Sequence, residues 1–265
     1  MKFQSNKGQA GLLLLLGFAA VAIFSCSGTP RDADDVIDRM IDAYGGPEKI
    51  ELMKSFVGKG FFKDQLGQAV VRYWPYDHFQ RGTMLKTKVA LIEKGKAYNI
   101  RFATYNGLNY RVATKYGDLL DITPIDIDLL PYRFPLILDW VQQTDAEGEL
   151  IDDGDESGVC KVEYAIPKYK IELGVDRSGW LLKYMRFESQ ADSIRVFRET
   201  YTDYWKVDGV PFPSRFTGTL QETRPYYEYY FVKTELGADL PDSTFILSQE
   251  ELDLIPEKGT GPAGQ

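Results

Sequence analysis

The sequence predicts a mainly β protein of the α+β class, in which a curved antiparallel sheet of about eleven strands carries helices on one face. Two observations lead to this class. Apolar residues recur at helical spacing between residues 33 and 53. From Ser55 onward, apolar and polar residues alternate with period two, and short turn signals divide the segments. Such a sheet must bury its apolar face, and the helices are the candidates to cover it.

The first 25 residues have the pattern of a secretory signal. Lys2 and Lys7 provide a basic start, and an apolar run follows at 10–24. This run is shorter than the about 20 residues that a membrane span needs, but it fits the h-region of a signal peptide. The run ends at Ser25-Cys26, which resembles the cleavage site of bacterial lipoproteins, where the cysteine receives a diacylglycerol. We therefore expect residues 1–25 to be removed and Cys26 to be the lipid-attachment residue of a short tether, residues 26–31. The alternative is an uncleaved N-terminal anchor helix.

The net charge and the cysteine count limit the partners and the covalent chemistry. A net charge of -8 argues against nucleic acid and against electrostatic docking on anionic headgroups, so membrane attachment would depend on acyl chains. Cys160 is the second of two cysteines, so a lipidated Cys26 leaves it without an intramolecular disulfide partner. We expect Cys160 to be a small buried apolar residue of a strand.

Two helices are expected at the start of the main domain. Three aspartates crowd the first turn of a helix that begins at Asp32, where they complement the helix dipole. Gly45-Gly46 ends this helix, and Pro47 begins a second, short helix that runs to Met53.

Strands and turns fill most of the remaining chain. Asn106-Gly107 predicts a hairpin over residues 97–116, and Asp208-Gly209 predicts another turn. Three prolines interrupt residues 119–143, where 134–143 is expected to be a short helix. Strands are expected near 55–63, 68–74, 87–93, 97–105, 108–116, 159–166, 169–175, 180–188, 194–207, 210–221 and 226–235.

Three stretches resemble the LolA/LolB superfamily of bacterial lipoprotein-localisation proteins. They are Ala43–Gly60 with its double glycine, Ile171–Leu182 with its aspartate-glycine turn, and Tyr204–Phe216 around Asp208-Gly209-Val210-Pro211. Phe245-Ile246-Leu247 is similar to the family's closing motif. The resemblance implies one domain over residues 32–247, a half-barrel with helices on its concave face over an apolar cavity. Residues 248–265 are then a polar tail that is expected to be disordered.

Aromatic side chains are the candidates to line such a cavity. Tyrosine combines an apolar ring with a polar tip, and the densest aromatic cluster lies at residues 226–231. We therefore predict Tyr227, Tyr229 and Phe231 as ligand-binding residues, with Trp140 of the 134–143 helix as a lid residue. The alternative is ordinary sheet packing, since aromatic residues favour strands.

No catalytic motif is found in the sequence. His78 is the one histidine, which excludes histidine-rich zinc sites, and no nucleophile elbow or phosphate-binding glycine loop is present. The acidic segment Asp145–Glu156 lacks the spacing of an EF-hand and is expected to be a solvated loop. We therefore expect no enzyme activity, cofactor or metal. A hydrolase that uses two carboxylates is the less favoured alternative, because such pairs are recognised only in space.

These expectations favour a binding protein. The leading hypothesis is a monomeric, lipid-anchored envelope protein, placed on the outer membrane and facing the periplasm, that holds an acyl chain, a lipid or a lipoprotein. The second hypothesis is an interaction or structural subunit of an envelope complex that binds no small ligand.

Overall fold

The computed structural model describes residues 28–64, 72–93, 96–114, 117–118, 128–190, 196–221 and 224–255. The chain divides into a short unit, residues 1–31, and a large unit, residues 32–265. The expected signal peptide, Cys26 and residues 256–265 lie outside the described residues. The predictions made for those segments therefore stay predictions.

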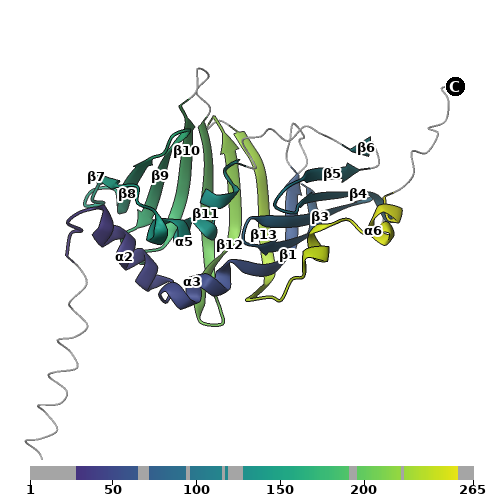
Figure 1. Cartoon of the computed structure of the whole chain (residues 1–265), viewed down its shortest axis with the longest axis horizontal. Helices are drawn as coiled ribbons and strands as arrows, with labels where there is room; N and C mark the ends of the chain where they lie inside the picture. Colours follow the sequence, from purple (N-terminus) through teal and green to yellow (C-terminus); the bar gives the residue numbers. More distant parts are fainter. Residues whose placement is uncertain are drawn as a thin grey trace, which may run out of the picture. The chain divides into compact units, whose positions relative to one another are not determined.

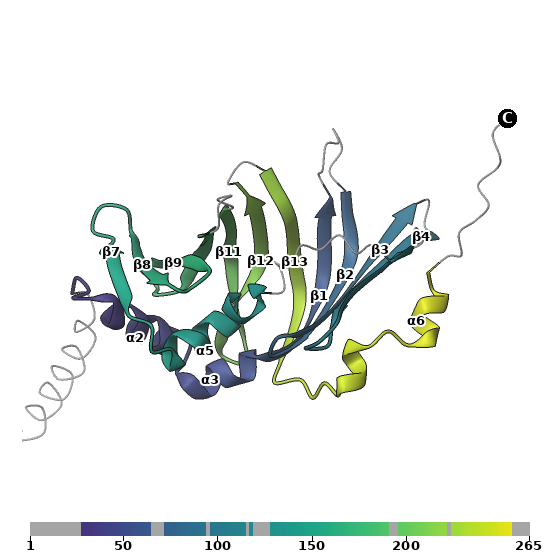
Figure 2. The same ribbon diagram turned by 45° about the horizontal axis from the view of Figure 1, so that its top comes forward.

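The described part of the large unit is built on one thirteen-stranded antiparallel sheet, with strand order β6-β5-β4-β3-β2-β1-β13-β12-β11-β10-β9-β8-β7. The strand β1 pairs with β13, so the first and last strands of the chain meet at the centre of the sheet. Figures 1 and 2 show how the sheet curves. The predicted half-barrel class is confirmed, with two strands more than the eleven expected. The strands are β1 Ser55–Asp64, β2 Arg72–Arg81, β3 Met84–Glu93, β4 Lys96–Tyr105, β5 Tyr110–Thr114, β6 Gly117–Asp118, β7 Gly148–Asp152, β8 Val159–Ala165, β9 Tyr169–Asp176, β10 Leu182–Ser189, β11 Val196–Val207, β12 Val210–Leu220 and β13 Arg224–Leu236.

Helices cover the concave face of the β7–β12 half of the sheet (Figure 2). They are α2 (Ala33–Ala43), α3 (Pro47–Met53), the 3-10 helix η1 (Leu130–Tyr132) and α5 (Leu136–Gln143). The Asp32 side chain caps α2 by accepting a hydrogen bond from the backbone N–H of Asp35. Apolar residues of α2 and α5 are buried in one core with side chains of β8–β12. This core fixes the position of α5 above the sheet.

The outer face of the sheet carries a second, smaller cover. The 3-10 helix η2 (Asp242–Phe245) and helix α6 (Gln249–Asp253) follow β13. Lys86 pairs in register with Phe79, the neighbour of His78, so Lys86 lies on the face of the sheet opposite to His78. Its Nζ is 2.5 Å from Oε1 of Glu251 on α6. A capping box of Ser248 and Glu251 begins α6. Residues 249–253 are therefore helical where the sequence predicted the start of a disordered tail.

Two strands differ from the sequence prediction. The edge strand β7 lies inside the segment that was expected to be a solvated acidic loop, because its backbone pairs with β8. The strand β2 extends to Arg81, well past the predicted end at residue 74, and Pro75 lies inside the ladder in register with Phe61. Gly82, with φ of +54°, forms the turn to β3 that the prediction lacked. Within the described ranges, no helix is long and apolar enough to cross a bilayer.

Candidate functional site

An aromatic cluster occupies the concave face at the centre of the sheet. Tyr227, Tyr229 and Phe231 alternate along β13 and so share one face. The ring of Tyr229 stacks on Phe216 at 4.9 Å and on Tyr227 at 5.4 Å between centroids. Phe231 lies 5.5 Å from both Phe216 and Tyr229. The structure thus brings the three predicted β13 residues together, as mutually packed rings.

A buried ion pair lies beside this cluster. Arg133, between η1 and α5, places Nη2 2.5 Å from Oε1 of Glu199 on β11. The hydroxyl of Tyr201 donates to Glu199 at 2.7 Å, and that of Tyr227 donates to the same carboxylate. Burial alone would raise the pKa of Glu199, but Arg133 and these hydrogen bonds hold it below its usual range. The network connects the helical cover to the sheet, and sequence analysis missed both charged residues.

His78 belongs to a second buried polar chain. Its Nδ1 lies 3.0 Å from the Tyr76 hydroxyl, and its Nε2 lies 3.1 Å from Oε1 of Gln80. Its ring stacks on Phe56 at 4.8 Å. Burial lowers the pKa of His78 to about 4, so the ring is neutral at pH 7. Since Gln80 Oε1 only accepts, this arrangement fits the tautomer with the proton on Nε2.

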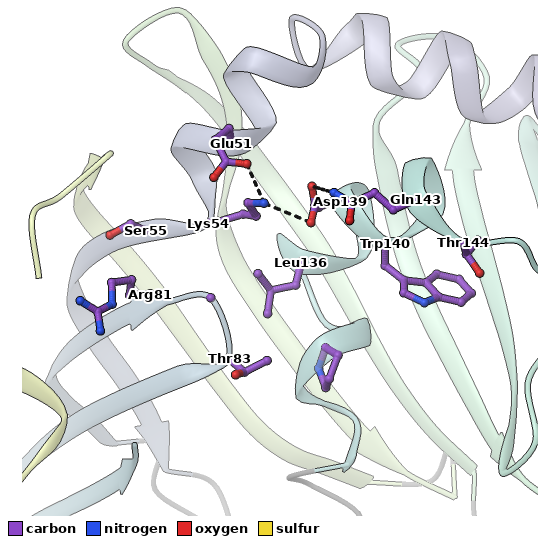
Figure 3. A pocket seen from close by; sticks show the side chains of 12 residues that line it. Glu51, Lys54, Ser55, Arg81, Thr83, Leu136, Asp139, Trp140, Gln143 and Thr144 are labelled. Carbon is purple, nitrogen blue, oxygen red and sulfur yellow. Dashed lines mark hydrogen bonds and ion pairs between the residues drawn. The ribbon is translucent and has the colours of Figure 1, made fainter. Parts of the chain in front are cut away.

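A pocket of about 620 Å³ opens at the rim of the half-barrel, between the end of α3, the β2–β3 turn and the η1–α5 segment (Figure 3). This volume is in the usual range of small-molecule sites. Trp140, Leu136 and Pro131 provide apolar surface. The other lining residues are polar, charged or glycine: Glu51, Lys54, Ser55, Arg81, Gly82, Thr83, Asp139, Gln143 and Thr144.

The cations of this pocket already have anionic partners within the protein. Lys54 Nζ lies 2.6 Å from Glu51 Oε2 and 3.1 Å from Asp139 Oδ2, as Figure 3 shows. Burial alone would lower the pKa of Lys54, but the two carboxylates raise it. Arg81 pairs with Asp242 and donates to the carbonyl oxygen of Leu240. The pocket therefore combines an apolar wall with internally neutralised charges, which suits a ligand whose binding depends on apolar contact.

Comparison with solved structures identifies the architecture. The LolA superfamily protein of Nitrosomonas europaea matches with a TM-score of 0.50 at 12% identity, over 82% of this chain and 98% of that chain. A DUF1329 family protein of Desulfovibrio piger matches with a TM-score of 0.50 at 10% identity, over 85% of this chain and 100% of that chain. The chain has the LolA fold. No family model and no curated protein sequence gives a significant match, and at these identities the structural likeness defines the fold alone.

Within this LolA fold, Trp140 lies apart from the β13 aromatic cluster. Its ring packs edge-to-face on Tyr132 at 5.3 Å and on Tyr164 at 5.2 Å. Its half-buried side chain forms part of the pocket wall. The four residues predicted to bind ligand therefore occupy two places, with Trp140 at the rim and the β13 rings in the packed interior.

The remaining candidate residues have structural roles in the LolA fold. Cys160 is fully buried, burial raises the pKa of its thiol, and its Sγ lies 3.1 Å from the carbonyl oxygen of Asp153. In the acidic segment, Asp152 accepts from the backbone N–H of Gly154 and pairs with Lys161 at 3.0 Å. Among the residues with described positions, no three His, Cys, Asp or Glu side chains gather as a metal site would require.

Proposed function

We propose that this chain is a lipid-anchored envelope protein that binds a hydrophobic ligand at the rim of its LolA-type half-barrel. The observation that carries the proposal is the rim pocket of about 620 Å³, which places Trp140, Leu136 and Pro131 in one wall. The ligand class is an acyl chain, a lipid or the acyl part of a lipidated protein. Cys26 would attach the chain to the membrane. The expected location is the outer membrane, with the protein on the periplasmic side.

The driving force for such binding is burial of apolar surface. Each CH₂ group removed from water contributes about 0.8 kcal/mol before ordering costs. Lys54 and Arg81 are already paired with Glu51, Asp139 and Asp242, so they offer little net charge to an anionic headgroup. Affinity should therefore rise steeply with chain length and depend weakly on salt.

The ligand is placed at the rim because the interior is occupied. Tyr229 and Phe231 are 8% and 3% exposed, and their rings pack on Phe216. A chain inserted between them would have to separate these contacts. The pocket beside Trp140 requires no such separation.

The packed interior also favours a second candidate function. A half-barrel whose concave face is filled by its own side chains does not need a cavity ligand, and would act as an interaction subunit of an envelope complex. Under this alternative, the rim pocket would hold a side chain of a partner protein.

A titration of the unlipidated chain, residues 27–265, with fluorescent fatty acids of increasing length separates the two candidates. Trp140→Asp should weaken binding, because the new carboxylate loses hydration in the pocket without gaining a partner. Leu108→Asp is the matched control, since Leu108 is 87% exposed and does not line the pocket. Failure to bind at any length would favour the interaction subunit. Equal affinity in Trp140→Asp and wild type would contradict binding at the rim pocket.

A further inference from the structure

We propose that the outer face of the four adjacent strands β13, β1, β2 and β3 docks on an anionic lipid surface. The outer patch consists of Phe61, Tyr73 and Val232 together with Lys59, Lys88 and Lys233. It lies on β13, β1, β2 and β3, on the face of the sheet opposite to the aromatic cluster. It is separate from the rim pocket and does not depend on the hydrophobic ligand.

The apolar part of the outer patch is unusually exposed for the middle of a sheet. Phe61 is 42% exposed, Tyr73 is 55% exposed and Val232 is 60% exposed. Tyr230, which pairs with Phe61 in register, holds Tyr73 edge-to-face at 6.0 Å between ring centroids. Large apolar side chains that gather on a surface mark interaction sites more often than scattered ones do.

The charged part of the outer patch is a row across four strands. Lys59 lies directly opposite Lys233 on β13, and like charges in such positions destabilise a sheet. On the other side, Asp77 pairs in register with Lys59 and with Lys88. Three lysines and one aspartate give this row a net positive charge. In the described part of the chain, no salt bridge involves Lys59, Lys88 or Lys233, although Lys88 Nζ lies 5.8 Å from the centre of the Phe102 ring. An external anion would relieve the repulsion between Lys59 and Lys233.

The position of the outer patch favours a bilayer over a protein strand. Since β1 is hydrogen-bonded to β13 and β2, and β13 to β12, these strands have no free edge to which a partner strand could add. Lysine and tyrosine both combine an apolar stem with a polar end, which suits the interface between headgroups and acyl chains. The net charge of -8 opposes approach at long range. However, salt screens it beyond about 8 Å, so the local row of lysines decides the interaction at contact.

The test uses the full chain, which is either mixed with vesicles or reconstituted into them. An environment-sensitive fluorophore is attached to a cysteine introduced as Tyr73→Cys. We expect a blue shift and a rise in emission with vesicles that contain phosphatidylglycerol, and neither with pure phosphatidylcholine. The response should be lost in about 1 M salt, where the Debye length is about 3 Å. Ile151→Cys on the edge strand β7 is the matched label control, because Ile151 is 50% exposed and lies outside the patch.

A charge reversal separates docking from folding. Lys233→Glu would replace the like-charge pair with an ion pair to Lys59, so the melting temperature should hold or rise while the fluorescence response is lost. Lys183→Glu on β10 makes the same charge change at an exposed site away from the patch and should leave the response intact.

The proposal is overturned if the fluorescence response is equal with anionic and neutral vesicles, or if Lys233→Glu leaves the response unchanged. It is also overturned if the fluorophore responds to a fraction of membrane proteins but not to lipid vesicles. The last result would assign the patch to a protein partner. Flotation with neutral vesicles measures attachment through the lipid anchor, and the fatty-acid titration measures ligand binding in the pocket. A negative result in either experiment can therefore be distinguished from loss of lipid docking at the outer patch.

Discussion

Arg133 and Glu199 form an ion pair beneath the helical cover, with Nη2 of the arginine 2.5 Å from Oε1 of the glutamate. The two residues are 66 positions apart in the chain, one beside α5 and the other on β11. The carboxylate is 1% exposed and also accepts hydrogen bonds from Tyr201 and Tyr227. The segment that precedes α5 is thus linked to the sheet through a carboxylate that is almost fully buried.

Removing the arginine should strongly destabilise the fold. Arg133→Met would leave the buried carboxylate of Glu199 without its cation, a change that costs about 3–5 kcal/mol in comparable buried pairs. Urea denaturation at pH 7 measures the free energy of unfolding. The double variant Arg133→Met/Glu199→Gln should recover part of the loss. Lys161→Ala is the control, because the Lys161–Asp152 pair is partly exposed and should contribute about 1 kcal/mol or less. Equal effects at the two pairs would contradict the buried-pair interpretation.

Stability should fall on mild acidification because of His78. Its pKa is about 4 in the folded protein, against an ordinary value of 6.5. The unfolded chain therefore takes up this proton first as the pH falls. The stabilisation is fully present above pH 6.5 and is lost progressively between pH 6.5 and 4.

Urea midpoints at several pH values test this dependence. His78→Gln should flatten the profile in that window, since the chain has no other histidine. Glu199 affects stability only at lower pH. Its pKa is depressed in the folded protein, so its contribution to the free energy of unfolding is lost only below pH 4.5, the ordinary pKa of a glutamate. A slope that persists between pH 6.5 and 5 in His78→Gln would assign the effect to other groups.

The turn between β11 and β12 should be sensitive at Gly209. Asp208 has φ of +51° and Gly209 has φ of +83°, and Val207 pairs with Val210. This is the left-handed geometry of a two-residue hairpin turn. A Cβ at Gly209 would meet nothing within 4 Å, so backbone strain is the main cost. Gly209→Val should destabilise by about 1–3 kcal/mol. Gly209→Asn should cost less, because asparagine tolerates positive φ. Matching denaturation midpoints for the two variants would argue against strain as the cause.

Membrane attachment should depend on Cys26. Wild type should incorporate labelled palmitate and stay with membranes through a high-salt wash, whereas Cys26→Ser should do neither and should keep its melting temperature. The salt wash removes any contribution of the outer patch. A Cys26→Ser protein that remains fully membrane-bound after the wash would support the uncleaved anchor helix.

The sequence alone determined the features that depend on neighbouring residues. Asp32 caps α2, Gly45 and Gly46 end it with φ of +94° and +83°, and Asp208-Gly209 forms its hairpin. In each case, the steric and hydrogen-bonding preferences of a few adjacent residues decide the local backbone. The mainly β class follows from the same kind of information, because the alternation and the turn signals are also local. The half-barrel itself was implied by the resemblance to the LolA/LolB superfamily.

Only the tertiary structure decided which distant residues meet. The pairing of β1 with β13 sets Lys59 opposite Lys233, and no pattern within either strand predicts that contact. The sequence predicted Trp140 as a lid over a cavity lined by the β13 aromatic residues, yet Trp140 lies at the rim pocket and Tyr229 in the packed interior. Arg133 and Glu199 gave no local signal. Such contacts depend on how the whole sheet curves and on which side chains it removes from water, and neither is encoded in any short segment.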